Sequence, residues 1–185
     1  MPNNVVCSPN DILNFWYNEI QPEDWFKKSD TLDNKIADKF LFTYQRAILG
    51  ELFGWRSSID GRLAEIILLD QFARSMFRGK AEAFAYDILA LTLAQEACRL
   101  QEAKDLAPNK KSFLYMPFMH SESILVHEVA VELFSEPGLE QNYKFELAHK
   151  RIIERFGRYP HRNEVLGRTS TPEEIEFLKT PGSSF

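Results

Sequence analysis

Arginine and histidine side chains are concentrated in one short segment, RFGRYPHRN, which begins at Arg155. The segment holds Arg158, His161, Arg162 and Asn163 in a chain whose formal charge is -5. Its glycine can end a helix and its proline prevents a restart, so these cations follow a helix C-terminus, where positive charge is favoured. One cation would satisfy that preference, whereas three arginines suit bidentate binding of carboxylates or phosphates. We therefore interpret the segment as an anion-binding wall, with dipole complementarity as the alternative.

A second set of polar residues lies in RLAEIILLDQFARSMFRG, at residues 62–79. On a helical wheel of about 100° per residue, Asp70, Gln71, Arg74 and Arg78 share one narrow arc of a mostly apolar helix. Asp70 and Arg74 are four residues apart, a spacing at which opposite charges pair. Two interpretations stay open: a structural ion pair in the core, or a carboxylate that orients Arg74 towards a cleft.

The chain has 4 histidines, and their surroundings differ. His127 and His149 share helical faces with apolar residues, a pattern more typical of buried core side chains than of ligands. His120 directly precedes a predicted helix start and lies close to Glu122 in the sequence. Free backbone N–H groups and the helix dipole attract anions at such a position. His120 is therefore a candidate site residue.

Histidine is suited to proton transfer near neutral pH. We take His120 and His161 as candidate general acids or bases, oriented by Asp70 or Glu122. Neighbouring arginines lower the pKa of a histidine and keep it neutral, so that it can act as a base. Whether the protein is an enzyme stays open at this stage.

The common motifs for metals, nucleophiles and nucleotides are absent from the sequence. It has no HExxH, no histidine pair at i and i+4, and no CxxC, so we predict no metal site; a metal held by His120, His161 and Asp70 is the weaker alternative. It has no GxSxG, no GxGxxG and no Walker lysine loop. The sequence indicates no cofactor.

The elements that must position these side chains are helices. The chain has 185 residues, 44% of them hydrophobic, which fits one globular domain. Helical periodicity dominates and strand alternation is nearly absent. We predict helices that start at residues 8–11, 31, 62, 80, 122, 139 and 172, with KKSFLYMPF as either helix or loop. The helix from residue 80 should extend to 103, with Phe84, Ile88 and Leu91 facing inward.

Short connections between these helices predict that neighbours pack antiparallel. The expected architecture is one all-α domain over residues 1–185, with a core of 8–179 and a tail, 180–185, that frays. Ser8 and Thr171 are predicted helix N-caps, each followed by proline and an acidic residue.

Charge and hydropathy limit the classes of partner. With 22 basic and 27 acidic residues, the chain lacks the basic surface that nucleic acids require. No apolar run approaches the about 20 residues that cross a bilayer, and the N-terminus does not resemble a signal peptide. Cys7 and Cys98 are too isolated to indicate a disulfide framework. We therefore expect a cytoplasmic protein whose partner is a small anionic molecule or an acidic peptide, with no indication of oligomeric state.

Five segments in order are LLDQFARSMFRG, AFAYDILAL, YMPFMHSES, RFGRYPHRN and GRTSTPEEIEFL. Together they resemble the bacterial domain-of-unknown-function 924 family over residues 11–178. The resemblance implies a tetratricopeptide-like all-α fold of stacked helix pairs, and it brings no established activity. The segments contain the polar positions selected above, and they draw attention to Asp87, which lies between Phe84 and Leu91.

Three hypotheses follow. In the first, Arg74, Arg78, Arg158 and Arg162 line a polar cleft for a small anion, with a histidine as acid or base. In the second, the same arginines clamp an acidic or C-terminal peptide on a helical-repeat surface. In the third, the polar residues form an internal network that only fixes helix packing.

Overall fold

The structure is a computed structural model that describes residues 5–184. Within that part of the chain the regular structure is helical and no strand occurs, which confirms the prediction of an all-α protein. None of the helices found in residues 5–184 has the length and apolar character needed to cross a membrane. The α-helices are α1 (Pro9–Asn14), α2 (Asp30–Ile48), α3 (Ile59–Ile67), α4 (Ala73–Met76), α5 (Asp87–Cys98), α6 (Gln101–Lys104), α7 (Pro108–Met119), α8 (Ile124–Phe134), α9 (Glu140–Phe156) and α10 (Pro172–Phe177).

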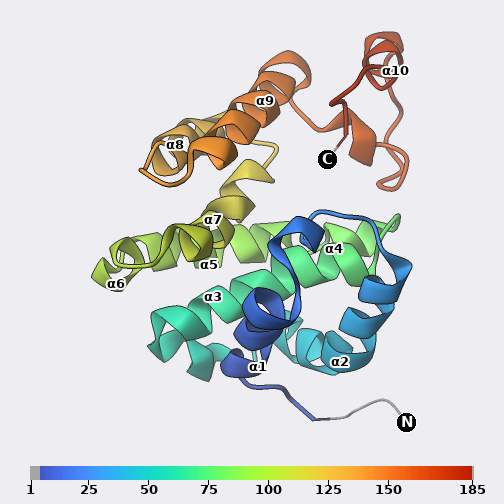
Figure 1. Cartoon of the computed structure of the whole chain (residues 1–185). Helices are drawn as coiled ribbons and strands as arrows, with labels where there is room; N and C mark the ends of the chain where they lie inside the picture. The colour runs from blue at the N-terminus through green and yellow to red at the C-terminus, as the bar shows by residue number, and fades with distance from the viewer. Residues whose placement is uncertain (1–4, 185) are drawn as a thin grey trace.

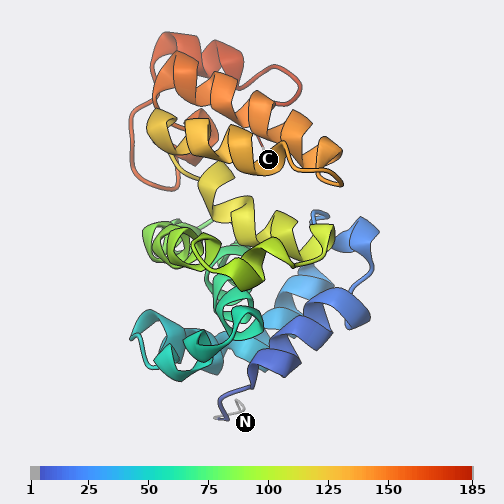
Figure 2. The same cartoon turned by 90° about the vertical axis from the view of Figure 1, so that its left-hand side faces the viewer.

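The helices form two parts (Figure 1). Helices α1 to α7 pack together, and α8, α9 and α10 lie beyond α7, as the second view also shows (Figure 2). The first part contains the larger core, in which the ring centroids of Phe40 lie 5.0 Å from Phe15 and 4.8 Å from Phe72. A smaller core in the second part includes Ile153 and Tyr159. The predicted site segments come from both parts.

Two helix starts follow directly from local sequence. The Ser8 side chain accepts a hydrogen bond from the Asp11 backbone N–H, and the Asp11 carboxylate accepts one from the Ser8 backbone. Thr171 and Glu174 make the same reciprocal contacts at α10. Both N-caps predicted from the sequence are confirmed. Such boxes satisfy backbone donors that would otherwise have no partner at a helix start.

One other prediction needs correction. The helix predicted over residues 80–103 is wrong at both ends, because α5 begins only at Asp87 and ends at Cys98, and Ile88, expected inside, is 72% exposed. Here tertiary contacts override helix propensity: the Phe84 ring lies 4.6 Å from the Arg162 guanidinium. In contrast, KKSFLYMPF, for which helix and loop were both open, lies entirely in α7.

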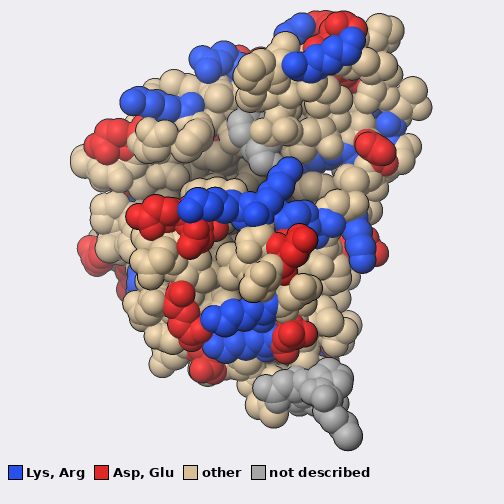
Figure 3. Space-filling view, turned by 45° about the vertical axis from the view of Figure 1, so that its right-hand side comes forward, with Lys and Arg blue, Asp and Glu red and all other residues tan. Residues whose placement is uncertain are grey.

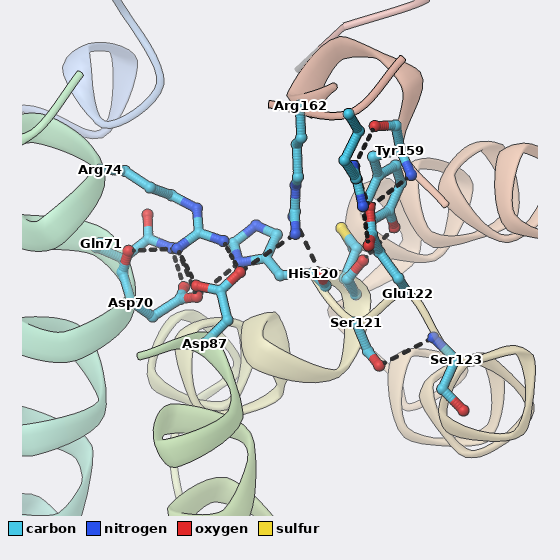
Figure 4. A network of polar contacts seen from close by, with 12 residues as sticks. Asp70, Gln71, Arg74, Asp87, His120, Ser121, Glu122, Ser123, Tyr159 and Arg162 are labelled. Carbon is cyan, nitrogen blue, oxygen red and sulfur yellow. Dashed lines mark hydrogen bonds and ion pairs between the residues drawn. The ribbon is translucent and has the colours of Figure 1, made fainter. Parts of the chain in front are cut away.

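The helix predicted from residue 62 contains a π-helical turn, Leu68–Phe72, between α3 and α4. Single π turns inside helices occur frequently at functional sites. This turn carries Asp70 and Gln71, both buried, at the side of the first part that faces α7 and the second part (Figure 4).

Candidate functional site

The centre of the candidate site is a contact between Asp70 and His120. The Nδ1 atom of His120 lies 2.7 Å from Oδ1 of Asp70. The Asp70 side chain is 1% exposed and that of His120 is 15% exposed. The Nε2 atom of Gln71 also donates to Asp70, at 2.5 Å. Three of the predicted site residues therefore meet at one buried carboxylate.

The ionisation of this pair follows from its surroundings. Burial acts to raise the pKa of Asp70, but the charge of Arg74 and the contact with His120 outweigh it, so this pKa lies below its usual value. Burial and Arg74 lower the pKa of His120. A carboxylate can only accept, so the proton of neutral His120 lies on Nδ1. Nε2 is then a lone-pair acceptor, and no hydrogen bond from residues 5–184 reaches it.

Arg74 links Asp70 to a second carboxylate. Its guanidinium donates to the Asp70 backbone oxygen at 2.8 Å and lies 3.1 Å from Asp70 Oδ1. It also makes a bidentate contact with Asp87, at 3.0 and 2.9 Å. Arg74 is therefore oriented by two acids. Asp87 was noticed in the sequence only through the family resemblance.

Arg162 reaches the same cluster from the second part of the molecule (Figure 4). It donates to Asp87 at 3.3 Å and to the His120 backbone oxygen at 3.0 Å. Its guanidinium lies 4.6 Å from the ring centroids of both Phe84 and Tyr159, where the ring faces favour a cation. Its Nε atom is buried and has no hydrogen-bond partner among the described residues. Burial, followed by the charge of Arg74, lowers its pKa.

In the close view, the His120 ring lies between the guanidinium groups of Arg74 and Arg162 (Figure 4). The side chains of Arg74 and Asp87 are 20% and 16% exposed, so the edge of the cluster reaches the surface. Two surface hollows, of about 350 and 410 Å³, lie elsewhere and include none of these residues. At the cluster, the surface is reached only through the partly exposed side chains of Arg74, Asp87 and His120.

The other histidines surround Tyr159. Its ring centroid lies 5.5 Å from that of His161, 5.7 Å from His149 and 6.3 Å from His127. Burial lowers the pKa of His149 to about 3, and burial together with Arg162 lowers that of His161 to about 4. The prediction that His127 and His149 are core residues is confirmed, since they are 0% and 6% exposed. His161 lies beside the Tyr159 ring, and the charges of Arg162 and His120 contribute to the lowering of its pKa.

Arg78 does not join the cluster, although the helical wheel placed it beside Arg74. Its guanidinium makes a bidentate contact with Asp33 of α2, at 2.5 and 2.8 Å. The physical reason is that α4 ends at Met76, so the wheel no longer describes the direction of the Arg78 side chain.

The residues of RFGRYPHRN contact two different regions of the structure. Arg158 binds Glu174 at 2.7 and 2.8 Å. Asn163 donates to the same carboxylate at 3.3 Å. Gly157, with φ +67°, ends α9 in the left-handed region and turns the chain just before these residues. Within the segment, Arg162 contacts the cluster, whereas Arg158 and Asn163 fasten α10 through Glu174.

Glu122 holds the chain next to the cluster. It accepts from the Tyr159 backbone N–H at 2.8 Å and makes a bidentate contact with Arg168, at 2.7 and 3.0 Å. It does not contact His120, for which it was a candidate orienting group; Asp70 occupies that role. Sequence reasoning missed Arg168 and Tyr159, and the aromatic residues between the cations of RFGRYPHRN were the available signal for Tyr159.

On one face of the molecule, Lys and Arg side chains form a band with Asp and Glu side chains directly beside them (Figure 3). Most cations of the site segments are likewise bound to carboxylates of the chain. No group of three or more His, Cys, Asp and Glu side chains within residues 5–184 is placed to hold a metal ion.

The fold and the five site segments define a class: an all-α protein with a buried carboxylate, histidine and arginine cluster. The sequence profile of DUF924, a family of bacterial proteins of unknown function, matches residues 12–182, so the chain belongs to that family. A solved structure of a protein of unknown function from Agrobacterium tumefaciens is 38% identical, with a TM-score of 0.88, and the match covers 92% of this chain and 96% of that one. The chain matches none of the curated proteins with which it was compared.

Proposed function

We propose that Arg162, Arg74 and His120 bind a small molecule through its carboxylate or phosphate group. The observation that carries this proposal is the incomplete pairing of Arg162. It is 6% exposed, yet its Nε has no partner within residues 5–184 and its contact with Asp87 is long, at 3.3 Å. A buried cation with unused donors favours a further acceptor.

His120 is the group that would do chemistry on such a ligand. Asp70 holds Nδ1 and so sets the tautomer and the direction of the ring, while Nε2 is left as the acceptor. Because burial and Arg74 lower the pKa of His120, the neutral form is present at pH 7 and acts as a general base. For His161, the other candidate, burial and the charge of Arg162 lower the pKa to about 4. Because the contact with Asp70 fixes the tautomer of His120, we assign the proton-transfer role to His120.

The peptide-clamp hypothesis has less support from the geometry. Arg78 and Arg158, which were expected to hold a peptide carboxylate, already make bidentate contacts with Asp33 and Glu174. A peptide would have to replace both contacts. The tetratricopeptide-like architecture and the cytoplasmic location stay predictions from the sequence.

A thermal-shift screen tests the small-anion proposal against the purely structural one. Sulfate, phosphate and small carboxylates should stabilise the protein, by about 2.7 kcal/mol at one hundred times Kd. Arg162→Met should abolish the shift. Arg155→Ala is the matched control, because Arg155 pairs with Glu173 at the surface, and it should keep the full shift. The proposal is wrong if no anion stabilises the wild type at millimolar concentration, or if Arg162→Met responds as the wild type does.

A further inference from the structure

We propose that the site binds its anion together with one proton, which His120 takes up on Nε2. This inference rests on the proposed function and adds the charge state in which the site accepts a ligand. It makes affinity depend on pH in a way that ordinary arginine-based anion binding would not.

First, the charges within the cluster balance one another. The carboxylates of Asp70 and Asp87 contact the guanidinium groups of Arg74 and Arg162 at 2.9 to 3.3 Å. These two negative and two positive groups balance, so with neutral His120 the cluster has no net charge. An anion placed here would meet as many carboxylates as guanidinium groups.

The second step is that the surrounding elements add no spare positive charge. Before α8, Glu122 is balanced by Arg168, which it contacts at 2.7 Å. From α9, the face towards the cluster carries His149, whose pKa burial lowers to about 3. From the segment after α9 come Tyr159, whose pKa burial raises, and His161. All of these groups or pairs are neutral near pH 7.

The third step is that a buried anion needs a counter-charge. Leaving a charge uncompensated in a dry environment is strongly unfavourable, and the group that can change protonation does so. The arginines are already charged. His120 is the group best placed to gain a proton, because the Asp70 carboxylate at 2.7 Å stabilises the imidazolium and Nε2 is open towards the ligand. In the complex, imidazolium would then bridge Asp70 and the anion.

The consequence is a defined pH dependence. Binding raises the pKa of His120 above its lowered value in the free protein. Between these two pKa values each bound anion takes up one proton, so affinity falls about tenfold for each unit that pH rises. Below the lower pKa the free protein is already protonated and the dependence disappears.

Calorimetric titration with sulfate tests this, since sulfate keeps one charge state over the range of measurement. Each titration is carried out in two buffers with different heats of ionisation, which counts the protons taken up. We expect close to one proton per sulfate at pH 7 for the wild type. In His120→Asn the amide can still donate to Asp70 from the place of Nδ1, so this variant should bind sulfate more weakly, without proton uptake and without pH dependence.

His161→Asn is the matched control, and it should keep the uptake. Sulfate binding by the wild type without a proton would overturn this inference and leave the proposed function standing. Uptake that persists in His120→Asn would overturn it as well, because another group would then carry the proton. If neither sulfate nor phosphate binds, the proposed function itself fails.

Discussion

Within residues 5–184, the pairs His120–Asp70 and His127–Glu146 make the same kind of contact through Nδ1 but differ in their surroundings. Nδ1 of His120 lies 2.7 Å from Asp70, and Nδ1 of His127 lies 2.6 Å from Glu146. Nε2 of His127 contacts the Ser121 backbone oxygen at 2.9 Å, and this pair is 0% exposed. In contrast, Nε2 of His120 has no hydrogen-bond partner within residues 5–184, and the His120 side chain is 15% exposed. The second ring nitrogen therefore separates the pair for which we propose proton transfer from the pair that joins α8 to α9.

The charges around the two carboxylates also differ. Arg74 and the contact with His120 hold the pKa of Asp70 low, whereas burial raises that of Glu146. Since Nε2 of His127 faces a carbonyl, it carries a proton, and the pair shares one more proton between Nδ1 and Glu146. The pair joins α8 to α9 inside dry protein. A buried histidine–carboxylate contact is thus no sign of catalysis unless a cation and an open nitrogen accompany it.

The largest effect should come from breaking the buried pair. Glu146→Ala should lower the free energy of unfolding by about 3–5 kcal/mol, because it leaves Nδ1 of His127 without a partner in dry protein. Urea denaturation measures the change. Glu146→Gln is the control: its amide can donate to Nδ1, so we expect a loss of only about 0.5–1.5 kcal/mol. Equal losses in the two variants would show that a charged carboxylate is required there.

Replacing the acid of the pair formed by Asp70 and His120 should change sulfate binding as well as stability. Asp70→Asn removes a charge from the network and should lower stability by about 1.5–3 kcal/mol. It also leaves the guanidinium groups in excess. We therefore expect this variant to bind sulfate without proton uptake, as measured by calorimetry. Proton uptake equal to that of the wild type would contradict the charge balance described above.

Stability should fall as pH falls from 6.5 to 5. The unfolded chain takes up protons with a histidine pKa of about 6.5, whereas native His149 and His161, with pKa values of about 3 and 4, do not. Each lowers stability by about 1.4 kcal/mol per pH unit over this window. The lowered pKa of His120 acts in the same direction, and Glu146, whose pKa is raised, offsets one histidine in part.

Denaturation curves at pH 6.5, 5.75 and 5 would measure this slope. His149→Gln should flatten it by about 1.4 kcal/mol per pH unit. Glu146→Gln should make it steeper, because that variant removes the opposing group. A slope that neither variant changes would place the titrating groups elsewhere.

The smallest effect should come from the exposed pair of Arg155 and Glu173, whose side chains are 52% and 63% exposed. Arg155→Ala should cost less than about 1 kcal/mol, since water and salt screen such contacts. Arg158→Ala, which removes the charged partner of the 3% exposed Glu174 carboxylate and leaves Asn163 as a donor, should cost more. Thermal denaturation of both variants measures the difference. Similar losses would mean that burial of the carboxylate does not matter here.

Much of the local structure was determined by the sequence alone. The apolar period of the helices, the N-caps at Ser8 and Thr171, and the pairing distance of Asp70 and Arg74 all depend on residues within one or two helical turns. Local rules describe them well because the interacting groups are held by the same short stretch of backbone. The sequence alone also showed which residue types are available to form the site.

Only the tertiary structure decided which of those residues meet. Asp70 and His120 are 50 residues apart, and Arg162 and Asp87 are 75 apart, so their contacts depend on how α5, α7 and the segment after α9 pack. The same packing places Arg78 in contact with Asp33, and Arg158 in contact with Glu174. Helix packing decides which carboxylate lies near each arginine, and neither composition nor a helical wheel contains that distance.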